Sequence, residues 1–270
     1  MTEHRDAPLP ASERRVKGAF IERDYLRGPR RRIDDTVELL RIGLEFIRGY
    51  RMLHFVGPCV TVFGSARIPE KDPAYALARE MGARLASAGF AVMTGGGPGI
   101  MEAANRGAWE VGGLSLGVNI VLPHEQQVNR YVDVFTTFQY FFVRKVMLVK
   151  YSYAFVILPG GFGTMDEVFN TLTLMQTGKT GLFPVVLMGV AYWEPLIRFL
   201  REVMVPAGTI AAQDVDLMLL TDSPAEATDY ILKAVVERFG LNWHANVRTP
   251  SRWLGERRRR KLWLEPADST

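Results

Sequence analysis

Hydrophobic residues change their spacing along the chain, and each change predicts a different element. Between Asp34 and Gly57 they recur at helical spacing, at Val37, Leu40, Leu44 and Ile47. Asp34 is the expected N-cap of this helix, and Gly57 with Pro58 ends the helix or the turn that follows it. Residues 59–63 are a short apolar run that stops at Gly64, which predicts a buried strand followed by a sharp turn.

The rest of the chain alternates between these two patterns. Short apolar runs predict further strands at residues 90–94, 114–122, 132–138, 154–158, 183–188 and 217–220. Amphipathic stretches predict helices at residues 73–88, 100–110, 140–150, 193–204 and 224–239, and another from the turn at 159–164 to about 177. Apolar strands that alternate with helices are typical of a parallel sheet covered on both faces. Right-handed crossovers then give an α/β fold, a doubly wound, Rossmann-like parallel sheet with helices on both faces.

Composition fits one folded domain with basic ends. The chain has 270 residues, of which 48% are hydrophobic, and a net charge of +4, so global disorder is excluded. Much of the basic charge is local, and we expect a basic arm at residues 1–33, the domain at 34–240 and a basic tail at 241–270. The single cysteine excludes a disulfide framework, the four histidines lack metal-ligand spacing, and no apolar run reaches the ~18 residues of a membrane span. These features predict a cytoplasmic protein with no membrane partner and no metal.

Three glycine-bearing turns follow predicted strands. They are Gly64-Ser65-Ala66-Arg67, the run that includes Gly96 and Gly97, and Gly160 to Thr164. Ligands of such sheets lie outside the carboxyl ends of the strands, so we expect the turns to share one crevice. A helix N-terminus suits a phosphate, and glycine lets the anion approach the backbone. The alternative is that the glycines only permit tight turns. Because two glycine-rich turns occur together, we favour the interpretation that they bind a phosphate.

Familiar nucleotide motifs are missing from these turns. Neither the triple-glycine turn nor the turn at residues 160–164 ends in the Gly-Lys-Ser/Thr of a P-loop. A GxGxxG motif that begins at Gly95 would need glycine where Ile100 stands. The sequence therefore argues against an ATPase and against a classical dehydrogenase.

Charged residues beside the turns suggest chemistry. Asp166 and Glu167 fall in the first turn of the helix after Gly163, where acids complement the helix dipole but could also reach a sugar. Arg144 and Lys145 point about 100° apart on another helix, so one can face the crevice while the other faces solvent. Arg67 could hold a phosphate with two hydrogen bonds.

Three segments together resemble the LOG (Lonely Guy) family: TGGGPGIMEAAN at 94–105, Arg144-Lys145, and PGGFGTMDE at 159–167. The family consists of nucleoside 5′-monophosphate phosphoribohydrolases, best known for releasing cytokinin bases. The similarity runs from about residue 59 to 220, and the arm, first helix and tail resemble the longer bacterial members. The resemblance implies a homodimer or larger assembly that needs no metal or organic cofactor. The family's other label, lysine decarboxylase, has no support here, because no constellation for pyridoxal phosphate is apparent.

The resemblance assigns catalysis to Arg144 and Glu167. It assigns nucleotide binding to the following matching positions: Gly160, Gly161, Gly163, Thr164, Lys145, Asp166, Thr173 and Glu125. Asp166 stands where the family often has a glutamate, and the match at Glu125 is loose. Glu102, after the triple-glycine turn, could contact substrate or simply complement the dipole of its own helix.

These residues predict hydrolysis of AMP or a cytokinin riboside 5′-monophosphate to a free base and ribose 5-phosphate. A carboxylate such as Glu167 could stabilise an oxocarbenium-like ribosyl centre, orient a water or hold the ribose hydroxyls. Arg144 could bind the phosphate, contact the departing base or keep Glu167 ionised. The alternatives are a non-catalytic nucleotide or molybdenum-cofactor carrier and a nucleotide sensor; a nucleic-acid protein ranks third.

Overall fold

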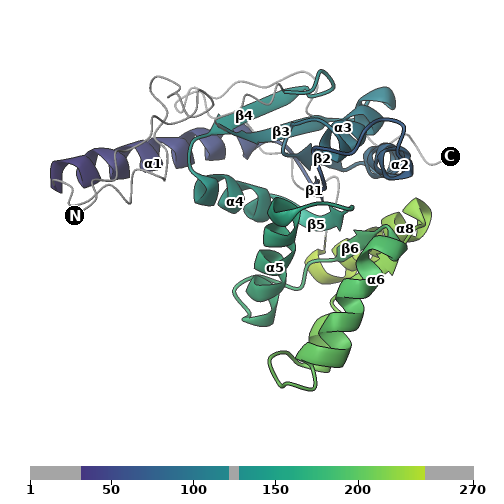
Figure 1. Ribbon diagram of the computed structural model, residues 1–270. Helices are drawn as coiled ribbons and strands as arrows, with labels where there is room; N and C mark the ends of the chain where they lie inside the picture. The colour runs from purple at the N-terminus through teal and green to yellow at the C-terminus, as the bar shows by residue number, and fades with distance from the viewer. Residues whose placement is uncertain (1–31, 122–127, 241–270) are drawn as a thin grey trace, which may run out of the picture.

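The computed structural model describes residues 32–121 and 128–240, and its centre is one seven-stranded parallel sheet (Figure 1). The strands are β1 (Cys59–Phe63), β2 (Ala91–Thr94), β3 (Ser115–Ile120), β4 (Val134–Phe138), β5 (Ser152–Ile157), β6 (Val185–Met188) and β7 (Met218–Thr221). Their order is β4-β3-β2-β1-β5-β6-β7, and every neighbouring pair is parallel. The order reverses direction between β1 and β5, which makes this the place where such a sheet opens a crevice for a ligand.

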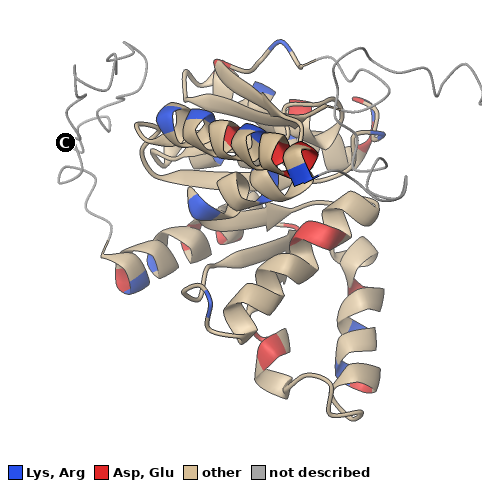
Figure 2. Cartoon of the chain, turned by 90° about the vertical axis from the view of Figure 1, so that its left-hand side faces the viewer, with Lys and Arg blue, Asp and Glu red and all other residues tan. Residues whose placement is uncertain are grey.

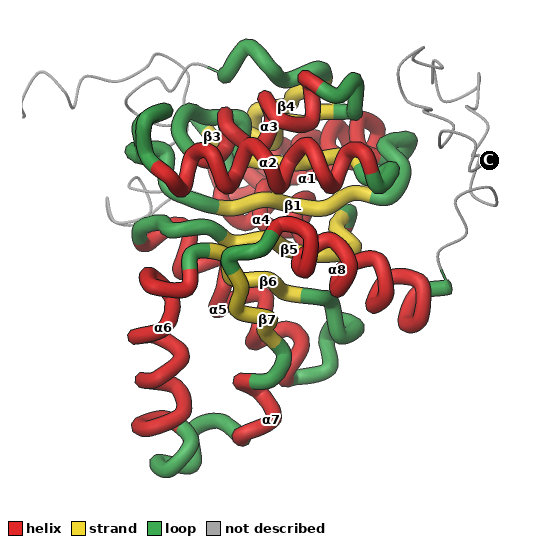
Figure 3. Tube along the Cα trace, turned by 90° about the vertical axis from the view of Figure 1, so that its right-hand side faces the viewer, coloured by secondary structure: helices red, strands yellow, loops and turns green. Residues whose placement is uncertain are grey.

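Helices cover both faces of the sheet. They are α1 (Arg32–Leu53), α2 (Pro73–Ser87), α3 (Ile100–Glu110), α4 (Phe141–Lys150), α5 (Phe162–Gln176), α6 (Val190–Phe199) with the π-helical segment η3 (Leu200–Met204), α7 (Ala212–Val215) and α8 (Pro224–Phe239). One core cluster joins the sheet to α1, α4, α5 and α6, and the other joins it to α2, α3 and α8. In Figure 3, α2 and α8 lie on the viewer's side of the strands. The predicted doubly wound α/β fold is confirmed.

Most predicted elements are present with small shifts at their ends, and two helices also differ from the prediction at their N-cap or in their last turn. The first helix begins at Arg32, so Asp34 lies in its first turn and is not the N-cap. The helix expected at 193–204 begins at Val190, after a left-handed Gly189, and its last turn is π-helical. The predicted arm and tail lie outside the described residues, apart from the start of α1. None of the helices in the described ranges is long and apolar enough to cross a bilayer.

Two glycines bring α2 and α3 into backbone contact. A Cβ at Gly107 would lie 1.8 Å from the carbonyl oxygen of Arg79, and a Cβ at Gly82 would lie 2.1 Å from that of Ala104. Both neighbours are backbone atoms, so an added methyl group must push the helices apart. This close approach requires glycine in the interior of both helices, where it otherwise costs stability.

We expect Gly107→Ala to lower the free energy of unfolding by about 2 kcal/mol or more, because overpacking at a rigid contact typically costs 1–3 kcal/mol. Chemical denaturation of the two proteins measures the difference. Gly163→Ala is the matched control, since no described atom lies within 4 Å of its Cβ position. Equal losses in both variants would contradict the packing argument.

Candidate active site

The three glycine-bearing turns meet at the carboxyl ends of β1, β2 and β5. The Ser65 N–H donates to the Pro159 carbonyl at 3.0 Å, which joins the turn after β1 to the turn after β5. The Ile100 N–H donates to the Ser65 carbonyl at 3.0 Å, which joins the same turn to the start of α3. The expected substrate-binding segments are therefore neighbours, on both sides of the point where the strand order reverses.

Several of these glycines serve the packing of the turns. A Cβ at Gly64 would lie 2.3 Å from the Ile100 side chain, and one at Gly99 (φ +68°) would lie 2.5 Å from the Ser65 carbonyl oxygen. Gly96 and Gly97 point their carbonyls at Asn129, which donates to both, at 2.9 Å and 3.0 Å. At these positions glycine allows the loops to pack closely and to hydrogen-bond with one another.

The glycines at the start of α5 are different. No described atom lies within 4 Å of a Cβ placed at Gly161 or Gly163, whereas a Cβ at Gly160 would meet the Thr164 hydroxyl at 2.1 Å. Tyr192 donates from its hydroxyl to the Gly160 carbonyl at 2.5 Å and so fixes the turn. The helix therefore begins with an uncovered glycine backbone, and the N–H groups of a first helical turn have no partner within their own helix.

Helices α4 and α5 are neighbours (Figure 1), and beside this helix start Arg144 of α4 approaches Glu167 of α5. Arg144 Nη1 lies 3.8 Å from Glu167 Oε1, and Arg144 Nε donates to the Val118 carbonyl at 2.8 Å. A Cβ at Gly95 would lie 2.7 Å from Arg144 Nη2. The guanidinium thus extends from the ends of β2 and β3 to the carboxylate on α5.

Burial dominates the electrostatics of this pair. Glu167 is only 5% exposed, and burial raises the pKa of its carboxyl, while the charges of Arg144 and Lys145 act in the opposite direction. Burial also lowers the pKa of Arg144, and the Glu167 carboxylate offsets part of that effect. Glu167 Oε2 is buried and accepts no hydrogen bond from any residue in the described ranges. A buried carboxylate oxygen that is left without a donor costs stability, which is typical of a functional site.

A second ion pair lies next to the first. Lys145 Nζ lies 2.7 Å from Asp166 Oδ2, and both side chains are more exposed than those of Arg144 and Glu167. Adjacent residues on α4 therefore pair with adjacent residues on α5, one pair buried and the other toward solvent. This is the division that the 100° angle between Arg144 and Lys145 predicts.

Four other predicted binding residues make different contacts, point in another direction or are not described. Glu102 accepts a hydrogen bond from the Tyr75 hydroxyl on α2 at 3.3 Å, so its carboxylate is engaged by the helix packed against α3. Arg67 is exposed, and its N–H donates to the Ser65 hydroxyl at 3.0 Å. Glu125 lies outside the described residues. Thr173 is the fourth.

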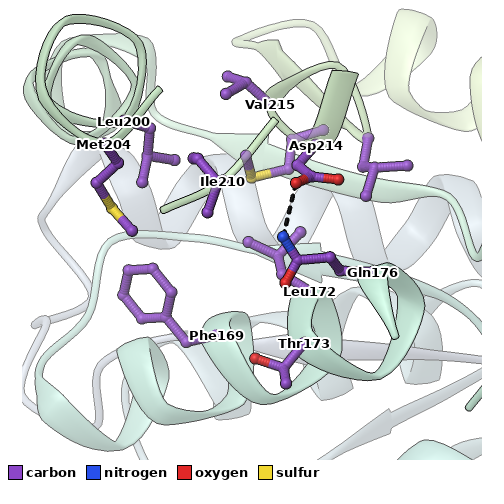
Figure 4. Close-up of a pocket in the computed structure, with 11 residues that line it drawn as sticks. Phe169, Leu172, Thr173, Gln176, Leu200, Met204, Ile210, Asp214 and Val215 are labelled. Carbon is purple, nitrogen blue, oxygen red and sulfur yellow. Dashed lines mark hydrogen bonds between the residues drawn. The ribbon is translucent and has the colours of Figure 1, made fainter. Parts of the chain in front are cut away.

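Thr173 is not on the face of α5 that carries Glu167. It lines a cavity of about 240 Å³ between α5, η3, α7 and β7, where Gln176 donates to Asp214 at 2.6 Å (Figure 4). Six residues along a helix rotate the side chain by about 240°, which accounts for the different direction. Thr171, one turn after Glu167, is buried instead, and its hydroxyl has no partner in the described structure. Sequence reasoning missed Thr171, although the spacing of four residues from Glu167 was the available signal.

Comparison with known proteins places the chain in a family. Residues 101–231 match a family described as "Possible lysine decarboxylase". The cytokinin riboside 5′-monophosphate phosphoribohydrolase LOG1 of Arabidopsis thaliana is 31% identical over 153 residues, which cover 53% of this chain and 68% of that protein. The chain belongs to the LOG family.

Two other proteins extend the comparison. The cytokinin riboside 5′-monophosphate phosphoribohydrolase of Mycobacterium marinum is 27% identical over 164 residues, which are 60% of this chain and 87% of that protein. The molybdenum cofactor carrier protein of Chlamydomonas reinhardtii has the same fold, with a TM-score of 0.51 and 24% identity over 67% of this chain and 99% of that one. Among the described residues, no group of three or more His, Cys, Asp and Glu side chains could hold a metal ion.

We expect Gly163→Ala to weaken nucleotide binding without destabilising this LOG protein. The added methyl group contacts no described atom of the protein, and alanine is favoured over glycine in a helix by up to ~1 kcal/mol. A phosphate held by the start of α5 would be displaced by the methyl group, so we expect the Kd for AMP to rise at least about tenfold. Calorimetric titration measures the Kd. An unchanged Kd would show that the phosphate does not bind at the start of α5.

Proposed function

We propose that this protein is a nucleoside 5′-monophosphate phosphoribohydrolase. The observation that carries the proposal is the buried Glu167 carboxylate, whose Oε2 has no protein donor while Oε1 lies 3.8 Å from Arg144. It stands in the helix that begins with the uncovered glycines Gly161 and Gly163. Relatives named as phosphoribohydrolases in plants and mycobacteria support the same activity.

The proposed substrate lies along the first turns of α5. Its 5′-phosphate accepts hydrogen bonds from the N–H groups at Gly161 to Gly163, where the helix dipole favours a dianion. Glu167 follows Gly163 by four residues, or roughly 6 Å along the helix axis, so the ribose that carries this phosphate comes within reach of the carboxylate.

Hydrolysis breaks the C1′–N bond and forms a C1′–O bond from water, and a proton of that water ends on the departing base. The ribosyl carbon gains positive charge in the transition state, as in glycoside hydrolysis. An ionised Glu167 stabilises that charge or orients the water, and the unpartnered Oε2 is the atom available for it. Arg144 is hydrogen-bonded to Val118 and close to Glu167, which favours the role of keeping the carboxylate ionised.

The alternative is a carrier that binds a nucleotide or the molybdenum cofactor without cleaving it. Such a protein would use the same glycine turns for phosphate. It would gain nothing from a buried carboxylate beside the anion, because like charges repel. The Arg144–Glu167 pair therefore favours the hydrolase.

Product analysis tests the proposal. The purified full chain is incubated with AMP, GMP, CMP, UMP and isopentenyladenosine monophosphate, and the free base is measured by chromatography. The hydrolase predicts base release from at least one of these nucleotides and ranks the bases. Tight binding of a nucleotide with no base release from any of them would favour the carrier.

A further inference from the structure

The first glycine of the triple-glycine turn, Gly95, borders the guanidinium of Arg144. The backbone φ of Gly95 lies outside the left-handed range that Gly96 occupies at +73°, so alanine would fit the backbone at this position. The limit is space, because a Cβ at Gly95 would lie 2.7 Å from Arg144 Nη2 and 2.7 Å from Met101 Sδ. The absence of a side chain at Gly95 therefore leaves room for the guanidinium.

The three nitrogens of the Arg144 guanidinium have three different neighbours. Nε donates to the Val118 carbonyl at 2.8 Å, Nη1 lies 3.8 Å from Glu167 Oε1, and Nη2 faces Gly95. Among the described residues, Val118 is the one that accepts a hydrogen bond from this group. A planar group can turn about a single hydrogen bond, so the contact with Gly95 limits where the guanidinium can lie.

The turn that carries Gly95 is held in place by buried polar side chains. Asn105 of α3 is fully buried, and its Oδ1 accepts hydrogen bonds from the Thr94 hydroxyl at 2.6 Å and from Asn129 Nδ2 at 3.0 Å. The Thr94 hydroxyl accepts from the Gly96 N–H at 2.9 Å, and the Asn129 N–H donates to the Gly96 carbonyl at 2.9 Å. A buried network whose groups are paired is rigid. The backbone at Gly95 is therefore a fixed boundary for the guanidinium.

The other cations of α4 already have partners. Lys145 Nζ lies 2.7 Å from Asp166 Oδ2, and Lys150 Nζ lies 4.9 Å from the centre of the Tyr50 ring. Basic and acidic residues are interspersed over the described helices in Figure 2. The positive charge beside Glu167 therefore depends on how the one side chain of Arg144 is placed.

We propose that Gly95 is a positioning residue, which sets the place of the Arg144 guanidinium beside Glu167 by leaving room for Nη2. This role differs from the phosphate binding that the sequence predicts for the glycine turns. Its consequence for the rate rests on the proposed function, because the rate depends on Glu167 acting on a nucleotide. Its consequence for the pKa of Glu167 does not, since Arg144 lowers that pKa in the protein without substrate.

Alanine at position 95 should displace Arg144 and leave the turn in place. Arg144 Nη2 and Met101 Sδ are at the ends of flexible side chains, whereas the turn is fixed by its network. Non-bonded heavy atoms are in contact at about 3.5 Å, so each of these two atoms must move by roughly 1 Å. We expect Gly95→Ala to lower the single-turnover rate with saturating AMP by about 10- to 100-fold. Its melting temperature should stay within about 3 °C of the wild type.

A double-mutant cycle shows whether the added methyl group acts through Arg144. The pKa of Glu167 is measured in the full chain without substrate, from the ¹³C chemical shift of its carboxyl carbon, which is assigned with Glu167→Gln. Gly95→Ala should move this pKa and lower the rate in the wild-type chain. In the Arg144→Met chain it should leave the pKa in place and change the rate less than about threefold.

Two outcomes of the cycle would overturn the proposal: an unchanged pKa of Glu167 in Gly95→Ala, or equal effects of this substitution in both chains. A wild type that releases no base would contradict the proposed reaction instead, and the pKa measurements would still decide the role of Gly95.

Two further substitutions separate other causes. Gly113→Ala is the matched control, because Gly113 is also buried and its Cβ would lie 2.4 Å from the Ala86 Cβ, before β3 begins. It should lower the melting temperature without moving the pKa of Glu167, and a pKa change as large as that in Gly95→Ala would overturn the proposal. Met101→Ala removes the second atom that the methyl group meets. Adding Gly95→Ala to Met101→Ala should still lower the rate at least about fivefold, and an unchanged rate would show that the methyl group acts on Met101 and not on Arg144.

Discussion

Replacing Glu167 by glutamine should lower the rate of base release at least about 1,000-fold, a loss in the range expected when a group that stabilises transition-state charge is removed. Glutamine keeps nearly the same shape and removes the charge, so the loss reports on the carboxylate itself. The measurement is the single-turnover rate with saturating AMP. Circular dichroism and the Kd for AMP show whether the variant is folded and still binds.

Asp166→Asn is the matched control for this substitution. Asp166 is the neighbouring acid on α5, but it is exposed and paired with Lys145. We expect its loss to change the rate less than about tenfold, because exposed ion pairs contribute little. A Glu167→Gln variant that retains wild-type turnover, or an Asp166→Asn variant with the larger loss, would contradict the assigned role of Glu167.

Replacing Arg144 by methionine should move the acidic limb of the pH–rate profile to higher pH. Burial already raises the pKa of Glu167, and Arg144 is the strongest influence that lowers it. Without the guanidinium the pKa rises further, so at a given pH a larger fraction of Glu167 is protonated and inactive. The rate falls as pH decreases through this pKa, so at pH 7 Arg144→Met should be slower than the wild type and should recover as the pH is raised.

Lys145→Met separates this effect from a general loss of positive charge. Lys145 also lowers the pKa of Glu167, but less than Arg144 does. The acidic limb should therefore shift in the same direction by a smaller amount. Profiles of kcat against pH give the position of the acidic limb for the wild type and for both variants. An acidic limb that does not move in Arg144→Met would show that Arg144 does not act by lowering the pKa of Glu167.

The sequence predicted the sheet well because most of its strands, all but the edge strands β4 and β7, are buried on both sides. Residues 59–63 and 154–158 are continuous apolar runs, and they became β1 and β5 with little change. The glycine turns could be placed at one edge of the sheet because parallel strands end together. Glu167 could be selected because it follows such a turn, and Arg144 because it interrupts an apolar helix and matches the Arg-Lys pair of the LOG family; the structure brings them within 3.8 Å.

Other features depend on which face of a helix packs, and spacing alone did not settle that. Glu102 is engaged by Tyr75 because α3 packs on α2, a contact between segments far apart in the sequence. Thr173 and Thr171 differ in direction by about 200°. The spacing of four residues puts Thr171 on the face of Glu167, but only the packed structure shows that this face is buried there and that Thr173 lines a separate cavity. On α1 the clearest apolar repeat, which includes Val37, Leu40 and Leu44, is exposed, while a weaker pattern around Gly49 packs on the body.

The most direct test of the proposed reaction compares AMP with adenosine. The phosphate-binding helix start and the buried carboxylate are proposed to act on one substrate, so cleavage should require the 5′-phosphate. Wild-type protein should convert AMP to equal amounts of adenine and ribose 5-phosphate, both quantified by chromatography with mass detection, and should leave adenosine essentially intact. Cleavage of adenosine at the same rate, or AMP bound and recovered unchanged, would contradict the account.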